Sequence, residues 1–271
     1  MSRGKTALVT GAAVRIGAVT VRQLHARGCD VLVHCNSRRQ EAEKIAAELN
    51  TERLDSAFVA QADLSTPRGV DALAGACRET FGQLDILVNN ASRFYPTDVG
   101  QTLAWQWDDL INSNLRGTYF LVQALLGELQ AAKGCVVNIV DIHAERPMPG
   151  YAVYNISKAG IAMMTKTLAQ EWAEYNIRIN AIAPGVIESS GLETYPEVIQ
   201  ASLNEARDAN LMKRFGTTED VAHAVMFYSS PLSSYISGTT LYVDGLDHLA
   251  APNMKMLNVM KQMMRSAEAG D

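Results

Sequence analysis

Short apolar segments alternate with longer segments of helical periodicity along most of the chain. The short segments are rich in valine, isoleucine and leucine, and continuous apolar runs of this kind are typical of strands buried on both faces. They occupy residues 6–10, 31–35, 56–61, 86–88, 136–140, 177–182 and 240–243. Helical patterns lie between them, up to about residue 28, over 41–49, from 66 onward, and over 105–131 and 154–175. This alternation predicts an α/β fold with a Rossmann-type, doubly wound parallel sheet and helices on both faces.

Two segments break the alternation. Residues 186–215 are poorly patterned and contain Gly191 and Pro196. Because long insertions near a site are usually functional, we expect a substrate lid there. Residues 251–271 carry methionines near helical spacing, and this tail is a helix packed on its own domain or a neighbour, a disordered end, or a surface for a flexible partner. The expected organisation is a single domain over residues 1–250 followed by the C-terminal tail.

The overall composition argues against several classes of partner. Hydrophobic residues make up 48% of the chain, enough for a sizeable core, and the formal net charge is −5. An acidic surface attracts neither nucleic acid nor an anionic membrane, and no apolar run reaches the ~18 residues of a spanning helix. The first residues enter a strand directly, which leaves no room for a signal peptide. The four cysteines and five histidines show no metal-like spacing, so we expect free thiols, structural histidines, no bound metal and a cytoplasmic location.

A glycine-containing turn follows the first strand. It runs from Gly11 to Gly17 and leads directly into a helix. Glycine lets the backbone approach a pyrophosphate closely, and a helix N-terminus favours its negative charge. Polar or bending residues also follow three later strands, as Asp63-Leu64, Asn89-Asn90-Ala91 and Pro184-Gly185. Because ligands of α/β sheets bind at the carboxyl ends of the strands, these segments together predict a nucleotide site.

The end of the second strand distinguishes between the two nicotinamide cofactors. An acidic residue there binds the ribose hydroxyls of NAD, whereas arginine suits the 2′-phosphate of NADP. The strand runs into Asn36, Ser37 and Arg38, with no acidic residue before Glu41. Arg38 can make charge-assisted contacts to phosphate, and Asn36 and Ser37 can add hydrogen bonds. We therefore predict NADPH as the cofactor; the alternative for Arg38 is a solvated residue at the start of a helix.

Three residues form a candidate proton-transfer group. Tyr154 and Lys158 are four residues apart in a helical pattern and share one face. The ammonium of Lys158 is expected to lower the pKa of Tyr154, which would make the phenol a usable acid. Asp141 follows the strand at 136–140, at the sheet edge where ligands bind.

Asp141 bears on the kind of substrate. Reducing a ketone builds negative charge on oxygen, which a carboxylate repels. Reducing a ring C=N bond requires protonation at nitrogen, and a carboxyl group stabilises the cation or delivers the proton. Asp141 beside Tyr154 therefore favours a nitrogen heterocycle, and the alternative is a turn aspartate that points away.

Together these motifs resemble the short-chain dehydrogenase/reductase family over residues 5 to about 248. The matching residues are Thr10-Gly11 through Gly17, Asn89-Asn90-Ala91, Asn114, Tyr154 with Lys158, and Pro184-Gly185. Two residues depart from the common pattern: Arg15 stands where most members have glycine, and Asp141 stands where most have the catalytic serine. Both departures resemble the pteridine reductases, as does the segment from Asn89 to Thr97.

The resemblance implies roles for individual residues. The catalytic set would be Asp141, Tyr154 and Lys158 with Asn114, which links Lys158 to solvent through water. Asp63 would hold the adenine amino group, Leu64 would cover the adenine face, and Asn89 would brace the sheet around the cofactor. The other implied cofactor-binding residues are Gly11, Arg15, Ile16, Gly17, Asn36, Ser37, Arg38, Ala91, Tyr154, Lys158, Pro184 and Gly185.

For the substrate, the resemblance implies that Phe94 stacks on a pterin ring. Ser92 and Arg15 would bind the polar edge of that ring, next to Asp141 and Tyr154. Family members commonly assemble as tetramers, so a homotetramer is expected.

The sequence therefore predicts NADPH-dependent reduction of a pterin ring, from dihydropterin to tetrahydropterin, with dihydrofolate as a further candidate. A reductase of another small carbonyl or imine is the alternative among enzymes. A non-catalytic NADP-sensing protein is the alternative of another class. The joint presence of Asn114, Tyr154 and Lys158 argues against a sensor, which needs only the nucleotide pocket.

Overall fold

The computed structural model of the chain describes residues 4–188 and 197–249. Within these residues, seven strands form one sheet in the order β3-β2-β1-β4-β5-β6-β7, and all neighbours pair in parallel. The strands are β1 (Thr6–Val9), β2 (Asp30–Cys35), β3 (Ala57–Gln61), β4 (Ile86–Asn89), β5 (Cys135–Ile139), β6 (Arg178–Pro184) and β7 (Thr240–Val243). The predicted doubly wound parallel sheet is confirmed.

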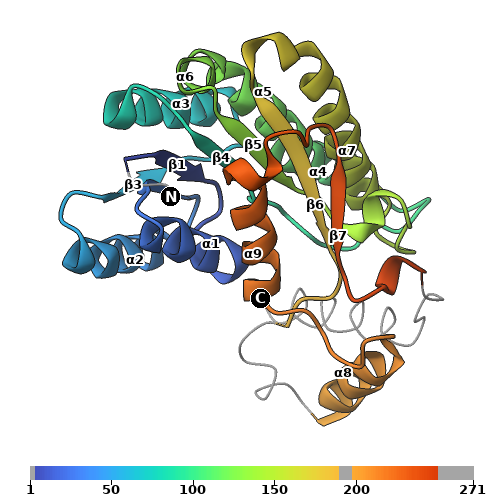
Figure 1. Cartoon of the computed structure of the whole chain (residues 1–271). Coiled ribbons are helices and arrows are strands. Elements are labelled where there is room, and N and C mark those ends of the chain that lie inside the picture. Colours follow the sequence, from blue (N-terminus) through green and yellow to red (C-terminus); the bar gives the residue numbers. More distant parts are fainter. Residues whose placement is uncertain (1–3, 189–196, 250–271) are drawn as a thin grey trace.

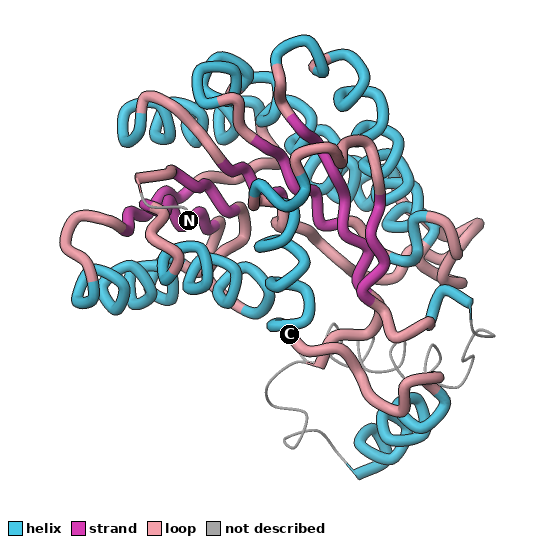
Figure 2. The backbone as a smooth tube through the Cα atoms, in the orientation of Figure 1, coloured by secondary structure: helices cyan, strands magenta, loops and turns pink. Residues whose placement is uncertain are grey.

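Helices cover both faces of this sheet (Figure 1, Figure 2). One layer contains α1 (Arg15–Ala26), α2 (Arg39–Glu52) and α9 (Thr218–Tyr228). The other contains α3 (Pro67–Phe81), α5 (Gly117–Ala124), α6 (Leu126–Ala132) and α7 (Ala152–Glu171). Alternate strand residues enter opposite cores, with Ala7 and Val9 in the first and Leu8 in the second. Because both faces are buried, the strands require the continuous apolar runs seen in the sequence.

The helix expected over residues 105–131 is interrupted. It begins as α4 (Ala104–Leu110), passes through the π-helical turn η1 (Ile111–Arg116) and continues as α5 and α6. The side chain of Asn114 in this turn bonds to the backbone nitrogen and oxygen of Arg93, at 2.7 and 2.9 Å. Turns of π-helix are frequent at functional sites. A single π turn is too short for its different period to show in the apolar pattern, so the sequence does not predict the interruption.

The segment expected to be a lid leaves the sheet at a defined point. Ile187 pairs with Gly216, and the N–H of Glu188 donates to the oxygen of Gly216 at 2.7 Å. Within the segment, α8 (Glu197–Ala209) is a helix that the poor patterning did not predict. Figure 1 shows α8 apart from the sheet, beyond the end of β6. Residues 189–196 of this segment and the tail at 251–271 lie outside the described residues.

The four cysteines of the chain are buried and form no disulfide, as expected. Among residues 4–188 and 197–249, no helix combines the length and apolar character needed to cross a bilayer.

Candidate active site

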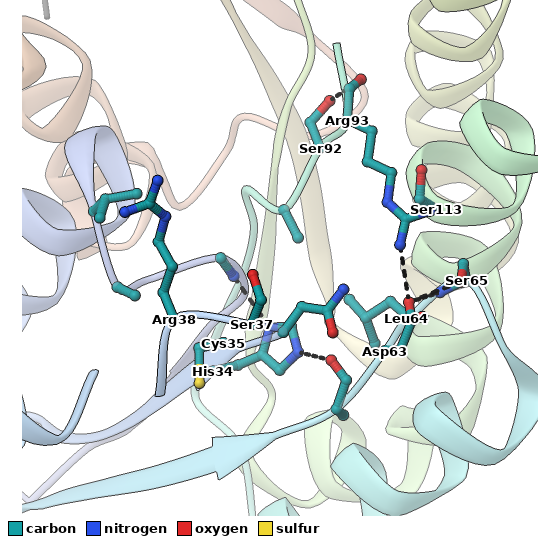
Figure 3. Close-up of a pocket in the computed structure, with 16 residues that line it drawn as sticks. His34, Cys35, Ser37, Arg38, Asp63, Leu64, Ser65, Ser92, Arg93 and Ser113 are labelled. Atoms are coloured by element: carbon teal, nitrogen blue, oxygen red, sulfur yellow. Dashed lines mark hydrogen bonds and ion pairs between the residues drawn. The ribbon is translucent and has the colours of Figure 1, made fainter. Parts of the chain in front are cut away.

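An open pocket lies at the carboxyl ends of β1 to β4 (Figure 3). Many of the predicted cofactor residues line it, namely Gly11, Asn36, Ser37, Arg38, Asp63, Leu64 and Ala91, and Ser92 lines it as well. The other predicted cofactor residues do not form its lining; these are Arg15, Ile16, Gly17, Asn89, Tyr154, Lys158, Pro184 and Gly185. The structure therefore gathers the residues expected near the adenosine part of a dinucleotide into one pocket.

The turn after β1 packs closely against the segment after β4. Gly11 has a φ of 61°, and a Cβ on it would lie 2.9 Å from the Cα of Ala91. A Cβ on Gly17 would lie 2.4 Å from the oxygen of Gly11. The side-chain amide of Asn90 donates to the oxygens of Thr10 and Gly11, both at 2.9 Å. Asn90 thus braces the turn, a role that was not predicted for it.

Asn89, in contrast, lies away from this turn and contacts the neighbouring strand. Its side-chain amide donates to Oδ1 of Asn138 at 2.8 Å, and the two residues are register partners on β4 and β5. Asn89 therefore links β4 to β5 through its side chain.

Arg15 begins α1 in an unusual backbone conformation. Its φ of 52° is in the left-handed region, which costs a non-glycine residue about 1 kcal/mol or more. The positive charge of Arg15 acts to lower the pKa of Tyr154, although larger effects oppose it. Arg15, which stands where most members of the family have glycine, therefore acts electrostatically on Tyr154.

His34 joins two segments of the pocket, a role that the sequence did not reveal. The N–H of Gly11 donates to Nδ1 at 3.1 Å, and Nε2 lies 3.0 Å from the oxygen of Ala62 (Figure 3). Because a carbonyl oxygen only accepts, the proton is on Nε2 and the ring is neutral. Burial lowers the pKa of His34 from 6.5 to about 4, against the opposing effects of the Ala62 carbonyl and the Asp63 charge.

Arg38 has a readily displaced partner. Its side chain is 61% exposed, and its Nη1 lies 3.3 Å from Oε1 of Glu41. An exposed pair of this kind contributes about 0–1 kcal/mol. An anion that binds Arg38 more closely can therefore replace Glu41 at small cost.

Asp63 presents one carboxylate oxygen to the protein. Oδ1 accepts from the N–H and hydroxyl of Ser65, at 3.0 and 2.8 Å, and lies 3.5 Å from Nη2 of Arg93. Burial acts to raise the pKa of Asp63, but the Ser65 hydrogen bonds and the Arg93 charge hold it below the usual value. All of these contacts between described residues use Oδ1, which leaves Oδ2 for an amino-group donor.

Tyr154 and Asp141 are in direct contact. The Tyr154 hydroxyl donates to Oδ2 of Asp141 at 2.6 Å, and only 5% of Tyr154 is exposed. Burial raises the pKa of Tyr154 well above its usual value, and the charge and hydrogen bond of Asp141 raise it further. The expectation that Tyr154 has a lowered pKa is therefore wrong for the free protein.

Lys158 explains why the expected effect is absent. Its Nζ donates to the oxygen of Ile139 at 3.0 Å and lies 5.7 Å from the centre of the Tyr154 ring. Burial lowers the pKa of Lys158 to about 8, although Asp141 acts in the opposite direction. The ammonium is therefore bound to the backbone beside the ring and does not contact the phenol oxygen.

Phe94 is placed beside these groups. Its ring stacks on Tyr151 with centroids 4.7 Å apart and planes at 13°, and it meets Tyr154 edge-on at 4.8 Å. Phe94 is 36% exposed. One face of the ring thus packs against the protein, and the residue remains accessible to a ligand.

Comparison with known proteins identifies the family. A family model described as Enoyl-(Acyl carrier protein) reductase matches residues 11–245. Pteridine reductase 1 of Leishmania tarentolae is 34% identical to this chain over 88% of it and 94% of the relative. The chain belongs to the short-chain dehydrogenase/reductase family.

Other members of the short-chain dehydrogenase/reductase family are equally similar. The 3beta-hydroxysteroid dehydrogenase 1 of Eggerthella lenta is 35% identical, with 90% of this chain and 93% of the relative covered. A crystal structure assigned as a betaketoacyl-ACP reductase has a TM-score of 0.80 and 33% identity, covering 90% of this chain and 98% of its own. Because these relatives are named for different substrates, membership establishes a nicotinamide-dependent oxidoreductase and leaves the substrate open.

Arg93 connects the parts of this short-chain reductase site, although no role was predicted for it. Its guanidinium pairs with Asp109 and with Asp63, while its backbone holds the fully buried side chain of Asn114. Asn114 also donates to the hydroxyl of Ser157 on α7 at 3.2 Å. These partners are distant along the chain, so no local pattern indicates them. Asn114, expected to bind water, fixes the segment after β4 to α7.

Proposed function

We propose that the protein is an NADPH-dependent pteridine reductase, which reduces a dihydropterin to a tetrahydropterin. The 2.6 Å hydrogen bond between Tyr154 and Asp141 is the observation on which the proposal rests. A carboxylate next to the tyrosine repels the oxyanion that forms during ketone reduction. The same carboxylate stabilises a protonated ring nitrogen, and in its acid form it delivers the proton. The pair thus suits a cyclic C=N bond better than a ketone.

The nucleotide pocket fits NADPH in its shape and its donors. Gly11 and Gly17 let the turn after β1 pack closely on itself and on Ala91, where a Cβ would clash. This turn leads into the N-terminus of α1, which favours the negative charge of a pyrophosphate. Arg38 and Ser37 would bind the 2′-phosphate, with Arg38 released from Glu41, and Oδ2 of Asp63 would accept from the adenine amino group. When bound, NADPH supplies the hydride that reduces the ring carbon.

The substrate pocket suits a flat, polar heterocycle. Phe94 is held in place by Tyr151 and Tyr154, which pre-organises an aromatic surface for offset stacking. We assign the polar edge of the pterin to Ser92 and Arg15. Asp141 and Tyr154 then face the ring nitrogen that is protonated.

A direct assay tests this proposal. Oxidation of NADPH is followed with dihydrobiopterin, dihydromonapterin and dihydrofolate, and in parallel with a quinone and an acetoacetyl thioester. We expect pterin-dependent turnover with NADPH and much weaker turnover with NADH. Turnover confined to the carbonyl compounds would instead support a reductase of another small substrate, and cofactor binding without any turnover would support a sensor.

We also propose that the protein is a cytoplasmic homotetramer. Large apolar side chains are exposed on α4, α5 and α7, among them Trp105, Trp107, Phe120 and Met163. Subunit contacts through these helices would remove this apolar surface from water. Cysteines that form no disulfide are compatible with a reducing compartment. Sedimentation that shows a monomer at micromolar concentration would contradict the assembly.

A further inference from the structure

The two oxygens of the Asp141 carboxylate have different partners. Oδ2 accepts the hydrogen bond from Tyr154 at 2.6 Å. Oδ1 accepts the backbone N–H of His143 at 2.9 Å and lies 3.9 Å from Nε2 of the same residue. Asp141 therefore stands between the catalytic tyrosine and an imidazole.

The ring of His143 is held in one orientation. Its Nδ1 lies 2.8 Å from the oxygen of Arg146, and since that oxygen only accepts, Nδ1 carries a proton. Proton exchange is thereby confined to Nε2, the nitrogen that faces Asp141. The separation of 3.9 Å is longer than a hydrogen bond, so proton transfer from Nε2 to Oδ1 requires a small rotation of the Asp141 side chain.

Other charged groups also lie around His143. Arg146 and Asp247, whose side chains approach to 3.5 Å, form an ion pair, and burial raises the pKa of Asp247, while the charges of Arg146 and His143 act to lower it. Asp244 contacts His248 at 2.6 Å. Asp141 differs from Asp244 and Asp247 because its carboxylate also accepts the hydrogen bond from Tyr154.

Solvent reaches both His143 and Asp141. Tyr154 and Lys158 are 5% and 2% exposed, whereas the side chains of His143 and Asp141 are 23% and 22% exposed. Reduction of a C=N bond consumes one proton per turnover, and that proton must be replaced from solvent. His143 has access to solvent on one side and to Asp141 on the other.

We propose that His143 is a proton relay that recharges Asp141 after each turnover, an inference that rests on the proposed pterin reduction. The Asp141 carboxyl gives its proton to the ring nitrogen and becomes a carboxylate. The imidazolium of His143 then gives the proton on Nε2 to Oδ1, and water reprotonates Nε2. The net reaction takes one proton from solvent and involves no change of oxidation state at the protein.

Two substitutions distinguish a proton-relay role of His143 from a purely structural one. His143→Ala keeps the backbone N–H that anchors Oδ1 but removes the ring. His143→Asn also keeps a side-chain amide that can donate to the Arg146 oxygen in place of Nδ1, but it cannot carry a proton. His223→Ala, at an exposed position on α9, is the matched control. Stopped-flow oxidation of NADPH with dihydrobiopterin resolves the first turnover from later ones.

We expect both His143 variants to show a first turnover at the wild-type rate, followed by steady-state turnover about 10²-fold slower, the lower end of what a positioned acid or base contributes. Added imidazole should restore the slow phase only. Magnetic resonance of isotope-labelled histidine should show the proton of neutral His143 on Nδ1 in the free protein.

Three outcomes would overturn the relay. His143→Asn could turn over like the wild type, the first turnover could slow as much as the steady state, or the labelled ring could carry its proton on Nε2. An inactive wild type would instead reject the pteridine reductase proposal itself, and the two failures are thereby distinguished.

Discussion

Acid should lower the folding stability of this protein through His34, because that ring holds the turn after β1 only while the ring is neutral. Nδ1 accepts from Gly11, and Nε2 donates to Ala62. Protonation of Nδ1 would place a donor against the N–H of Gly11. The folded protein resists this, since burial lowers the pKa of His34 from 6.5 to about 4.

The size of the effect follows from that pKa. Above pH 6.5 the ring is neutral in the folded and unfolded states and adds nothing to the pH dependence. Between pH 6.5 and about 4 the unfolded chain binds a proton that the folded protein excludes, so the free energy of unfolding falls as the pH falls. The loss is about 2 kcal/mol at pH 5 and approaches about 3 kcal/mol near pH 4, at about 1.4 kcal/mol per unit of pKa.

Urea unfolding at pH 7.5, 6 and 5, monitored by circular dichroism, measures this loss. In His34→Asn the side-chain oxygen can accept from Gly11 in place of Nδ1 but does not titrate. We expect the variant to lose about 2 kcal/mol less than the wild type between pH 7.5 and 5. His223→Asn, on the surface, should follow the wild type. Burial also lowers the pKa of His25, which is retained in all three proteins and cancels in the comparison.

Parallel pH profiles for the wild type and His34→Asn would refute the reasoning. The ring would then either titrate alike in both states or remain neutral throughout. NADPH binding could also weaken in acid in the wild type but not in His34→Asn. That result would show that His34 supports cofactor binding through the turn after β1.

Three further predictions concern the proposed reaction. Arg38→Ala should raise the KM for NADPH roughly tenfold to a hundredfold, since a charge-assisted contact contributes about 1.5–3 kcal/mol. The KM for NADH should change little. Equal changes with both cofactors in steady-state assays would contradict the phosphate contact. Phe94→Ala should weaken pterin binding by ~1–3 kcal/mol and spare NADPH, and a parallel loss of both in fluorescence titrations would make Phe94 a packing residue. Asp141→Ser should reduce pterin turnover by about 10²–10⁴-fold while quinone turnover holds or rises, and unchanged pterin turnover would remove the carboxyl group from the mechanism.

The sequence was sufficient for the sheet and for much of the pocket because both follow from local rules. Continuous apolar runs indicate strands buried on both faces, and the residues after them meet at one edge of a parallel sheet. Gly11, Arg38 and Asp63 could be placed together on that basis alone, and the structure brings them into one pocket. The sequence also contains a local signal for the start of α9, where Thr217 and Asp220 form a reciprocal cap.

The remaining features depend on contacts between distant segments. Arg93 meets Asn114 and Asp63, and His34 meets Gly11 and Ala62, across separations that leave no periodic trace. The pKa of Tyr154 was predicted in the wrong direction because helical spacing places Lys158 on the same face but does not reveal that its Nζ binds the oxygen of Ile139. Spacing along a helix gives proximity, whereas burial and the actual hydrogen-bond partner determine the electrostatic effect.

The left-handed backbone at Arg15 has a consequence for protein engineering. Glycine adopts this φ without strain, so Arg15→Gly relaxes the start of α1. A redesign guided by folding stability alone would choose that substitution early and would discard a positive charge that acts on Tyr154. We therefore expect thermostability and activity to compete at position 15, so that a library screened for heat resistance would drift away from catalysis there.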